Sequence, residues 1–600
     1  MKKIISLSSF FLIVVVAVII IGFANDAFLS SNDNSNITGD QQYNKTTLNK
    51  SNRISEVIYS KKLLLKFDQI NIFTYNKQPK NSKSLNSFTR AASSLKLSRR
   101  NLELFIKSAK QNIVFRIPMS EGKYMELELT QQTVISPDFE LASKSPSGEK
   151  QEPYTPGIYY RGIIKGDENS IASISVFEDN VIGIMSNAYG NYVLGRVKGN
   201  SNSFKEDYIF YNDADLLISN DFKCHVDDYD AKFVRALTEA TGNLNNSNNG
   251  FNSDQATLPV KVYFEADYKM YQDNNSSLTE VANTITGIFN SVSTIYQNEN
   301  IPFEIRKIAA WTSIDPYAYL SSSIPILLEF GGRTQDNFEG NLAHLLSTRN
   351  EGLGGIAWVR VLCMEFSPQD SAGRYAFSNI ETSYNNYPTY SWTVGCITHE
   401  MGHNLGSMHT HACVWPTGGI DLGAIDSCYA SGENIGICFP GYLQTGTWIP
   451  RVGTIMSYCH LTASQGGGIN LTYGFGSLPG DTIRLRYNQA PCLERTMNSS
   501  EIPVAFNLLQ NYPNPFNPGT NLKFALPHDA NITLRVFDIN GREIAELVSG
   551  RFYEKGIHTY YFDSQRYSLS SGIYFYQLGA TDPIKGNQVY TEVNKMILVK

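Results

Sequence analysis

The chain has 600 residues, a formal net charge of −6, and a composition that is 42% hydrophobic and 12% aromatic. A chain of this length exceeds what one hydrophobic core can organise, so the sequence predicts several domains. We find no basic stretch interleaved with aromatic residues, which argues against nucleic acid as a partner.

The N-terminus predicts export from the cytoplasm. Two lysines precede an apolar run from Ile4 to Phe23, and small residues up to Ala24 provide a cleavage site for a signal peptidase. An uncleaved membrane anchor is the alternative, because the run is long enough to cross a bilayer. We favour a signal peptide over residues 1–24, which leaves no stable membrane span after cleavage. Residues 25–55 are rich in Asn, Ser, Asp and Thr and are predicted to be disordered.

Residues 56–241 are predicted to form a β-rich domain. Clusters of β-branched and aromatic residues alternate there with Gly, Asn and Asp turns. The predicted strands are Asn112–Ile117, Tyr124–Leu129, Gly157–Ile164, Ile171–Phe177 and Val181–Ser186. A polar, asparagine-rich linker follows over residues 242–256 and is a natural place for proteolytic cleavage.

Residues 257–496 alternate between strand and helix patterns, which predicts an α/β domain. Apolar residues at three-four spacing predict a helix from Leu278 to Ile295, and Ser277 with Glu280 forms its capping box. The other predicted strands are Val260–Glu265, Phe303–Trp311 and Gly355–Cys363, and the other predicted helices are Phe338–Ser347 and Thr393–Leu405.

One short run in the last of these helices combines metal ligands, a base and a turn. His399 and His403 lie one helical turn apart on the same face, where both imidazoles can reach a single tetrahedral zinc ion. Glu400 lies beside them and can take the proton of a zinc-bound water as that water attacks a peptide carbonyl. Gly406 can adopt the left-handed conformation that ends a helix, which returns His409 to the metal as third ligand. The fourth position stays open for water. Ordinary histidines on a surface helix would match this spacing only rarely.

This run resembles the extended zinc motif of the metzincin zinc peptidases, which also carry a methionine turn downstream. Gly453–Tyr458 looks like that turn, and Met456 matches the methionine that forms an apolar floor beneath the metal. The nearest branch is the reprolysin (adamalysin-like) type in its bacterial form. That branch is favoured by three segments, His403–Gly406, Gly354–Trp358 and Gln489–Leu493.

The chain departs from the reprolysin pattern after the third histidine. Reprolysins usually carry an Asp there, whereas this chain has Thr410 followed by His411. Pappalysin-like metzincins are therefore the second choice. We expect His411 and His460 to have structural or substrate-side roles, because three histidines already complete the ligand set.

The metzincin resemblance implies a fold and several roles. It implies a metzincin catalytic domain of α/β (α+β) type, with a twisted, mostly parallel sheet and the zinc helix beneath it. Gly355–Val359 would be an edge strand that pairs with an extended substrate. Tyr458 lies where astacin-like and serralysin-like metzincins carry a tyrosine that touches the metal or the oxyanion, although a merely packed tyrosine is the alternative. The stretch from Tyr159 to Ser175 is similar to reprolysin propeptides, so residues 56–241 would be a prodomain.

All cysteines except Cys224 lie between Cys363 and Cys492, and export makes disulfides reasonable. By resemblance to reprolysins, Cys363 and Cys492 look like partners. The same resemblance suggests a short Cys428–Cys438 loop and a Cys413–Cys459 bond across the site, leaving Cys396 as a buried thiol. The sequence alone does not fix this connectivity.

Cys224 lies alone, upstream of the presumed mature enzyme. A thiolate is a strong zinc ligand, so a prodomain cysteine can fill the open coordination position and keep a zymogen silent as a cysteine switch. A disulfide with Cys396 and a plain buried thiol are the alternatives.

A second linker, residues 497–505, precedes a predicted C-terminal β-sandwich over residues 506–600. The predicted strands are Leu522–Leu526, Ile532–Asp538, His558–Phe562, Gly572–Leu578 and Lys595–Val599. Three motifs, Tyr512–Pro518, Phe537–Arg542 and Ser571–Tyr576, together resemble the type IX secretion sorting domain of Bacteroidota-like bacteria. A generic adhesive sandwich is the alternative.

Together these features predict a secreted or cell-surface zinc endopeptidase that is made as a zymogen. Its expected partners are a protein or peptide substrate and the type IX secretion machinery. Zn²⁺ is the expected cofactor; Ca²⁺ occurs in secreted metzincins, but we find no calcium ligand cluster of recognisable spacing. The competing hypothesis is a non-catalytic surface adhesion protein that retains a metzincin fold. Glu400 favours catalysis, because a binding relic has no need of it.

Overall fold

The structure is a computed structural model that describes residues 52–77, 82–198, 206–220, 222–225, 258–349, 352–380, 387–416, 423–426, 428–429, 452–465, 467–493, 505–511, 513–553, 555–583 and 586–599. The predicted signal peptide, the linker over residues 242–256, nearly all of the second linker, and Cys438 lie outside these residues. Within the described part, no helix is both long and apolar enough to cross a membrane. We call residues 52–225 the N-terminal region, 258–493 the central region and 505–599 the C-terminal region.

The N-terminal region is built on one ten-stranded sheet in the order β1-β4-β5-β8-β9-β10-β11-β12-β3-β2. In that order the strands are Asp68–Ile70, Asn112–Ser120, Lys123–Gln132, Ile158–Ile164, Ile171–Val176, Val181–Asn187, Gly190–Arg196, Asp207–Asn212, Ser93–Leu97 and Phe73–Tyr75. Its helices are α3 (Arg53–Leu64), α4 (Ser82–Phe88) and α5 (Arg99–Ser108).

Helix α3 begins inside the segment that was predicted to be disordered. Its first turn is capped by Asn52, whose side chain accepts hydrogen bonds from the backbone N–H groups of Ile54 and Ser55. Ile54 and Ile58 are buried in the main apolar core. The prediction of disorder up to residue 55 followed the polar composition around residue 50 and did not take these two apolar residues into account.

The central region contains a seven-stranded sheet in the order β16-β17-β15-β13-β14-β6-β7. In that order the strands are Gly355–Ala357, Tyr375–Asn379, Leu342–Ser347, Val260–Ala266, Phe303–Trp311, Ile135–Ser145 and Gly148–Glu152. Strands β17, β15, β13, β14 and β6 run parallel, whereas β16 and β7 at the two edges are antiparallel to their neighbours. The last two strands come from the N-terminal region, so the sheet joins the two regions.

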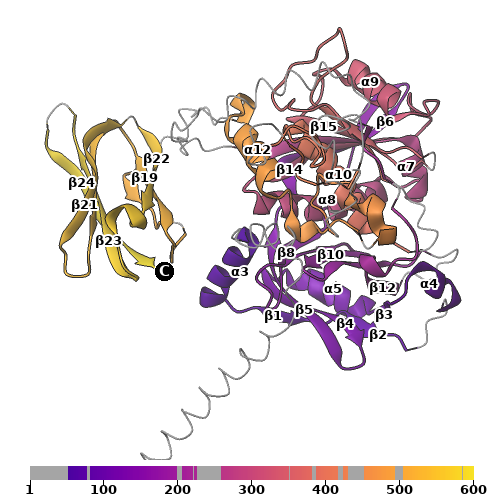
Figure 1. The fold of residues 1–600 in the computed structure, drawn as a ribbon, viewed down its shortest axis with the longest axis horizontal. Coiled ribbons are helices and arrows are strands. Elements are labelled where there is room, and N and C mark those ends of the chain that lie inside the picture. The colour runs from indigo at the N-terminus through magenta and orange to yellow at the C-terminus, as the bar shows by residue number, and fades with distance from the viewer. Residues whose placement is uncertain are drawn as a thin grey trace, which may run out of the picture. The chain divides into compact units, whose positions relative to one another are not determined.

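Two helices pack on one face of this sheet and a third packs on the other. Helix α8 (Leu278–Asn298) and helix α10 (Tyr390–Asn404) share the larger apolar cluster with the sheet, while α9 (Ser323–Thr334) packs in a second cluster (Figure 1). The predicted cap of α8 is present, since the Ser277 side chain accepts a hydrogen bond from the Glu280 N–H.

The prediction of a helix over Phe338–Ser347 is wrong. Residues Leu342–Ser347 form strand β15, which lies between β13 and β17 with every residue buried. A short, continuously apolar run fits a fully buried parallel strand as well as a buried helix, and periodicity cannot separate them. Helix α9 precedes this strand and was missed.

The strand predicted over Gly355–Cys363 is much shorter. Strand β16 ends at Ala357, and both Arg360 and Cys363 have left-handed backbone conformations, with φ of 60° and 68°. The chain turns there because the N–H of Arg360 donates to the carbonyl of His403, at the end of α10, at 2.8 Å.

The C-terminal region has two sheets around one apolar cluster. The first sheet contains β18 (Asn507–Leu508), β19 (Gly519–Leu526) and β22 (Gly556–Asp563). The second contains β21 (Glu543–Tyr553), β20 (Ala530–Phe537), β23 (Gly572–Thr581) and β24 (Gln588–Leu598). Strand β21 was not predicted, because its exposed, charged face interrupts the apolar pattern.

Candidate active site and metal centre

Three histidine side chains converge at the end of α10. The Nε2 atoms of His399 and His403 are 3.2 Å apart, and each lies 3.1–3.2 Å from Nε2 of His409. All three residues are buried, with no more than 2% of their surface exposed. Gly406 between them has a φ of +96°, the left-handed conformation expected of a residue that turns the chain at a helix end.

Backbone carbonyls fix the orientation of the rings. Nδ1 of His399 lies 2.7 Å from the carbonyl oxygen of Ile455, and Nδ1 of His403 lies 2.7 Å from that of Ser407. Nδ1–H donation of this kind directs the Nε2 lone pairs toward the common centre. The His409 backbone is held by the Trp415 indole, whose Nε1–H donates to its carbonyl at 2.7 Å. Burial, together with the neighbouring imidazoles, lowers the pKa of His399 well below its ordinary value, which favours a neutral ring.

The donor geometry fits zinc. At Zn–N bonds of about 2.0–2.1 Å, a tetrahedral ion holds its ligand nitrogens roughly 3.3 Å apart, close to the separations seen here. The Sγ atom of Cys224 lies 3.5 Å from Nε2 of His403. A tetrahedral zinc thiolate with a Zn–S bond of about 2.3 Å would place sulfur roughly 3.6 Å from each nitrogen. Cys224, His399, His403 and His409 therefore form a compact set of four donors.

Glu400 lies beside the histidines with its side chain fully buried. Its Oε2 is 3.4 Å from Sγ of Cys224, so the thiol is within reach of the carboxylate. Gly355 of β16 makes this approach possible, because a Cβ added there would lie 2.1 Å from Oε1 of Glu400. The carboxylate is thus held between the zinc helix and the edge strand.

Residues Phe222–His225, which we call the strap, lie along the edge strand. The carbonyl of Lys223 accepts a hydrogen bond from the Gly355 N–H at 3.0 Å, and Cys224 forms a parallel bridge with Gly355. The Tyr458 hydroxyl accepts from the Cys224 N–H at 3.0 Å and donates to the Cys224 carbonyl at 2.6 Å. The strap therefore occupies the edge of β16 next to the histidines.

The remaining predicted residues surround this centre. Met456 is fully buried and packs closely against Gly402 of α10. A Cβ on Gly402 would lie 2.8 Å from Sδ of Met456, so only glycine leaves room for this side chain. His411 stacks on His409 with ring centroids 4.9 Å apart. His460 lies with Nε2 2.8 Å from the carbonyl oxygen of Phe222, on the strap.

The cysteine pairing differs in part from the prediction. Cys363 is bonded to Cys492, but Cys428 is bonded to Cys459 rather than to Cys438. The error has a physical cause: the short 3-10 helix that follows Met456 brings Cys459 within 4.8 Å of Cys428, Cα to Cα, although the two are 31 residues apart in sequence. Cys413 is also disulfide-bonded, so the predicted Cys413–Cys459 bond is wrong.

Cys224 and Cys396 are both thiols, which excludes a disulfide between them. Cys396 is a buried thiol in α10, as predicted. Burial raises the pKa of the Cys396 thiol well above its ordinary value, so this residue stays protonated and unreactive.

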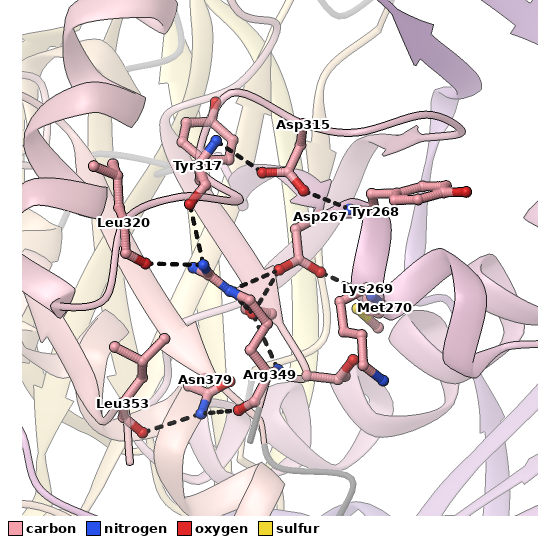
Figure 2. Close-up of polar contacts among 12 residues, drawn as sticks. Asp267, Tyr268, Lys269, Met270, Asp315, Tyr317, Leu320, Arg349, Leu353 and Asn379 are labelled. Atoms are coloured by element: carbon pink, nitrogen blue, oxygen red, sulfur yellow. Dashed lines mark hydrogen bonds and ion pairs between the residues drawn. The ribbon is translucent and has the colours of Figure 1, made fainter. Parts of the chain in front are cut away.

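A buried polar cluster that includes Asp267, Arg349 and Asn379 anchors the chain ahead of the edge strand (Figure 2). The Asn379 side chain donates to the carbonyls of Arg349 and Leu353 at 2.8 and 3.1 Å, which fixes the approach to β16. Arg349 donates to the carbonyls of Tyr317 and Leu320 and lies 3.5 Å from Asp267. Burial raises the pKa of Asp267 to about 7.

Sequence reasoning missed the function of the two edge-strand glycines and of the strap beyond its cysteine. Gly354 was noted only as part of a family pattern, and Gly355 in addition only as the start of the predicted edge strand. Their adjacency was the available signal, because paired glycines in a strand mark a close approach of other atoms. A Cβ on Gly354 would lie 1.6 Å from the Lys223 carbonyl oxygen.

Comparison with known proteins agrees with this geometry. Residues 256–463 match the family described as metallo-peptidase family M12, of the reprolysin type. The chain contains an M12 metallopeptidase domain. This M12 domain makes the chain a zinc metalloendopeptidase, as predicted. Residues 510–592 match the secretion system C-terminal sorting domain, which indicates type IX secretion to the cell surface or the medium.

A relative of the M12 domain is snake venom metalloproteinase trimerelysin-2 from Protobothrops flavoviridis. It is 24% identical over 159 residues, which cover 25% of this chain and 72% of the venom protein. Two solved structures show only remote likeness. One, described as a chaperone–substrate complex, has a TM-score of 0.22 and 15% identity, and covers 40% of this chain and 36% of its own. The other is catalytically inactive OgpA from Akkermansia muciniphila with an O-glycopeptide, with a TM-score of 0.19 and 11% identity, covering 57% and 93%.

Proposed function

We propose that the protein is a zinc endopeptidase made as a latent zymogen, in which Cys224 occupies the fourth metal position. One observation carries the proposal: the three Nε2 atoms and the Cys224 Sγ lie at separations that suit one tetrahedral zinc ion. Three ligands from the M12 domain and one from the N-terminal region would fill all four positions of the metal and leave none for a catalytic water.

The residues of the M12 domain have distinct roles once the strap has left. His399, His403 and His409 hold the zinc ion, which supplies Lewis-acid chemistry that polarises a carbonyl and acidifies a water. Glu400 accepts the proton of the attacking water and returns it to the departing amide nitrogen. Strand β16 offers the Gly355 N–H to an extended substrate, where the Lys223 carbonyl lies in the latent form. The Tyr458 hydroxyl is freed from Cys224 and can then stabilise the oxyanion.

Latency follows from three contacts of the strap. Its thiol excludes water from the metal, its approach to Glu400 occupies the general base, and its backbone covers the edge strand. We further propose that the N-terminal signal and the C-terminal sorting domain send this closed form through both membranes before it is activated.

The catalytic proposal is tested with Glu400→Ala. We expect casein hydrolysis to fall by at least about a thousandfold, because the general base and its proton transfer are lost, while bound zinc per molecule is unchanged. The matched control is Glu329→Ala on α9, where the carboxylate pairs with Arg333 at the surface, and this change should leave hydrolysis intact. If activated wild-type protein binds zinc but cleaves no member of a peptide library, the non-catalytic adhesion hypothesis replaces ours.

The latency proposal is tested with Cys224→Ser in the uncut chain. Because a serine hydroxyl is a poor zinc ligand, we expect hydrolysis without any proteolytic activation, and X-ray absorption at the zinc edge should show the loss of one sulfur neighbour. Cys396→Ser is the control, since that thiol is equally buried but lies outside the donor set. Equal latency in both variants would exclude the switch.

A further inference from the structure

Helix α8 of the M12 domain is buried on nearly all sides by two different sheets. Its residues from Ile285 to Tyr296 are all buried, which is unusual for a helix at the surface of its own domain. One side faces the seven-stranded sheet, where Phe289 packs on Phe264 with ring centroids 5.3 Å apart. The other side faces the N-terminal region, where the Ser291 hydroxyl lies 2.7 Å from that of Ser173.

The two regions share one apolar core at this helix. The main cluster joins Ile163, Ile171 and Ile182 of the N-terminal sheet to Ile288 and Val292 of α8. Gly287 marks the closeness of the contact, because a Cβ there would lie 2.7 Å from Cδ1 of Ile182. Removing the N-terminal region would expose to water the side of α8 that faces it, including buried apolar surface of the shared cluster and the polar side chains of Asn290 and Ser291.

The sheet of the M12 domain is also shared. The β6–β7 hairpin of the N-terminal region pairs in parallel with β14, from Ile305 to Trp311. Basic residues on β14 meet acidic residues of the hairpin: Lys307 lies 2.6 Å from Glu149, and Arg306 lies 3.2 Å from Glu140. Without the hairpin, β14 would become an open strand edge with unpaired backbone groups.

A buried carboxylate of the M12 domain depends on the hairpin for a positive charge. Glu265 is fully buried on β13, and its Oε2 lies 2.6 Å from Nζ of Lys144 on β6. The other groups that contact it are neutral donors: Tyr263, Trp311 and Tyr317. Loss of Lys144 would leave a buried charge without its counter-ion, which is costly.

The strap is attached in a different way. It contacts the M12 domain through a few polar groups, the Cys224 thiol, the Phe222 ring against His399 and the edge of β16, and its apolar contacts belong to the second cluster rather than to the shared core. Residues Leu216–Asn220 follow β12 and the short 3-10 helix after it, and they precede the strap in the chain. The strap can therefore leave the cleft without disturbing the shared core.

We propose that residues 52–216 are a permanent subunit of the active enzyme, and that activation displaces only the strap. The partner that covers α8 and β14 is then the cleaved N-terminal fragment of this same chain. This inference rests on the proposed latency. It also implies that the N-terminal region forms part of the wall of the active-site cavity in the mature enzyme. Asn191, Asp213 and Leu216 line a cavity of about 360 Å³ together with His399 and Trp392.

The test uses the full secreted chain carrying Cys224→Ser and a site for a highly specific protease within the predicted linker, residues 242–256. After complete cutting, size-exclusion chromatography without denaturant should elute both fragments together, and the shared peak should hydrolyse casein. Separation into a free N-terminal fragment and a folded, active protease fragment would overturn the inference.

Variants of the interface sharpen the result. Lys144→Met should weaken the affinity between the cut fragments at least tenfold, and Gly287→Leu should do so independently by clashing with Ile182. Lys165→Met is the matched control, because Lys165 pairs with Glu126 inside the N-terminal region and should have no effect. Unchanged affinity in both interface variants would contradict us. Fragments that stay together but hydrolyse nothing would refute the proposed protease function while leaving the subunit inference standing.

Discussion

Tyr458 connects the two states of the proposed enzyme through one hydroxyl group. In the structure this hydroxyl holds both the N–H and the carbonyl of Cys224. A Tyr458→Phe change should make Cys224 of the uncut chain react about tenfold faster with an alkylating reagent, because two hydrogen bonds that hold the strap, each worth about 0.5–1.5 kcal/mol, are lost.

The same variant tests the catalytic role of the tyrosine. In activated enzyme, turnover by Tyr458→Phe should fall by about tenfold or more if the hydroxyl stabilises the oxyanion. Steady-state kinetics on a peptide substrate would measure this fall. Unchanged turnover would leave Tyr458 as a residue that packs the cleft and secures the strap.

His344 on β15 predicts how the fold responds to acid. Burial lowers the pKa of His344 to about 3, and its Nε2 lies 2.8 Å from the Ser378 hydroxyl. The unfolded chain takes up a proton near pH 6.5, whereas the folded chain does so only near 3. Stability therefore falls as the pH drops through this window, by up to about 1.4 kcal/mol per pH unit.

The check is thermal unfolding at several pH values between 7 and 4, for wild type and for His344→Gln. A glutamine retains a polar contact for Ser378 but does not titrate, so the variant should lose less stability on acidification. Parallel curves for the two proteins would show that another group controls the acid response.

At the level of elements, the strap lies close against the edge strand because Gly354, directly before β16, has no side chain. A Cβ on Gly354 would lie 1.6 Å from the Lys223 carbonyl oxygen. Gly354→Ala should therefore push the strap off the edge of β16, so that the uncut chain becomes active and Cys224 reacts faster with an alkylating reagent. Gly395→Ala in α10 is the control, because a Cβ there meets no atom within 4 Å. Equal labelling rates would contradict the predicted clash.

At this level, prediction succeeded where the local sequence determines the structure and failed where contacts between distant segments determine it. The limits of α8 followed from apolar spacing and a capping serine, and the zinc helix followed from ligand spacing. Strand β15 was misread because its neighbours on both sides of the sheet, rather than its own pattern, make it a strand. The hairpin β6–β7 could not be placed in the M12 sheet at all, because its pairing with β14 joins segments more than a hundred residues apart.

Within the candidate site, the structure brings together the histidines, Glu400 and Cys224 that the sequence singled out, because metal chemistry restricts residue type and, for the histidines, spacing. It did not identify the orientation of the strap or the role of Gly355, which arise only when β16, α10 and the strap meet. The Cys428–Cys459 bond was equally hidden, since it depends on where the chain travels after Met456.

At the scale of the whole molecule, the Cys363–Cys492 bond ties the turn after β16 to the end of the central region across 129 residues of sequence. Replacing both cysteines by serine should lower the free energy of unfolding by about 2–5 kcal/mol, because the unfolded chain gains freedom. Denaturant titration measures this change, and zinc content should stay the same since neither sulfur belongs to the donor set. A loss below about 0.5 kcal/mol would mean that the unfolded state is already compact.

The shared sheet also bears on the journey of the protein out of the cell. Exposed strand edges invite pairing with other chains, and such pairing leads to aggregation. In the latent form, β16 is covered by the strap, and the opposite edge is β7, whose residues Gly148–Gln151 are exposed and include both Glu149 and Lys150. Alternating charges on an exposed edge strand discourage a second strand from docking there. Under the proposed latency, the closed form would thus be protected against self-association as well as against premature proteolysis during secretion.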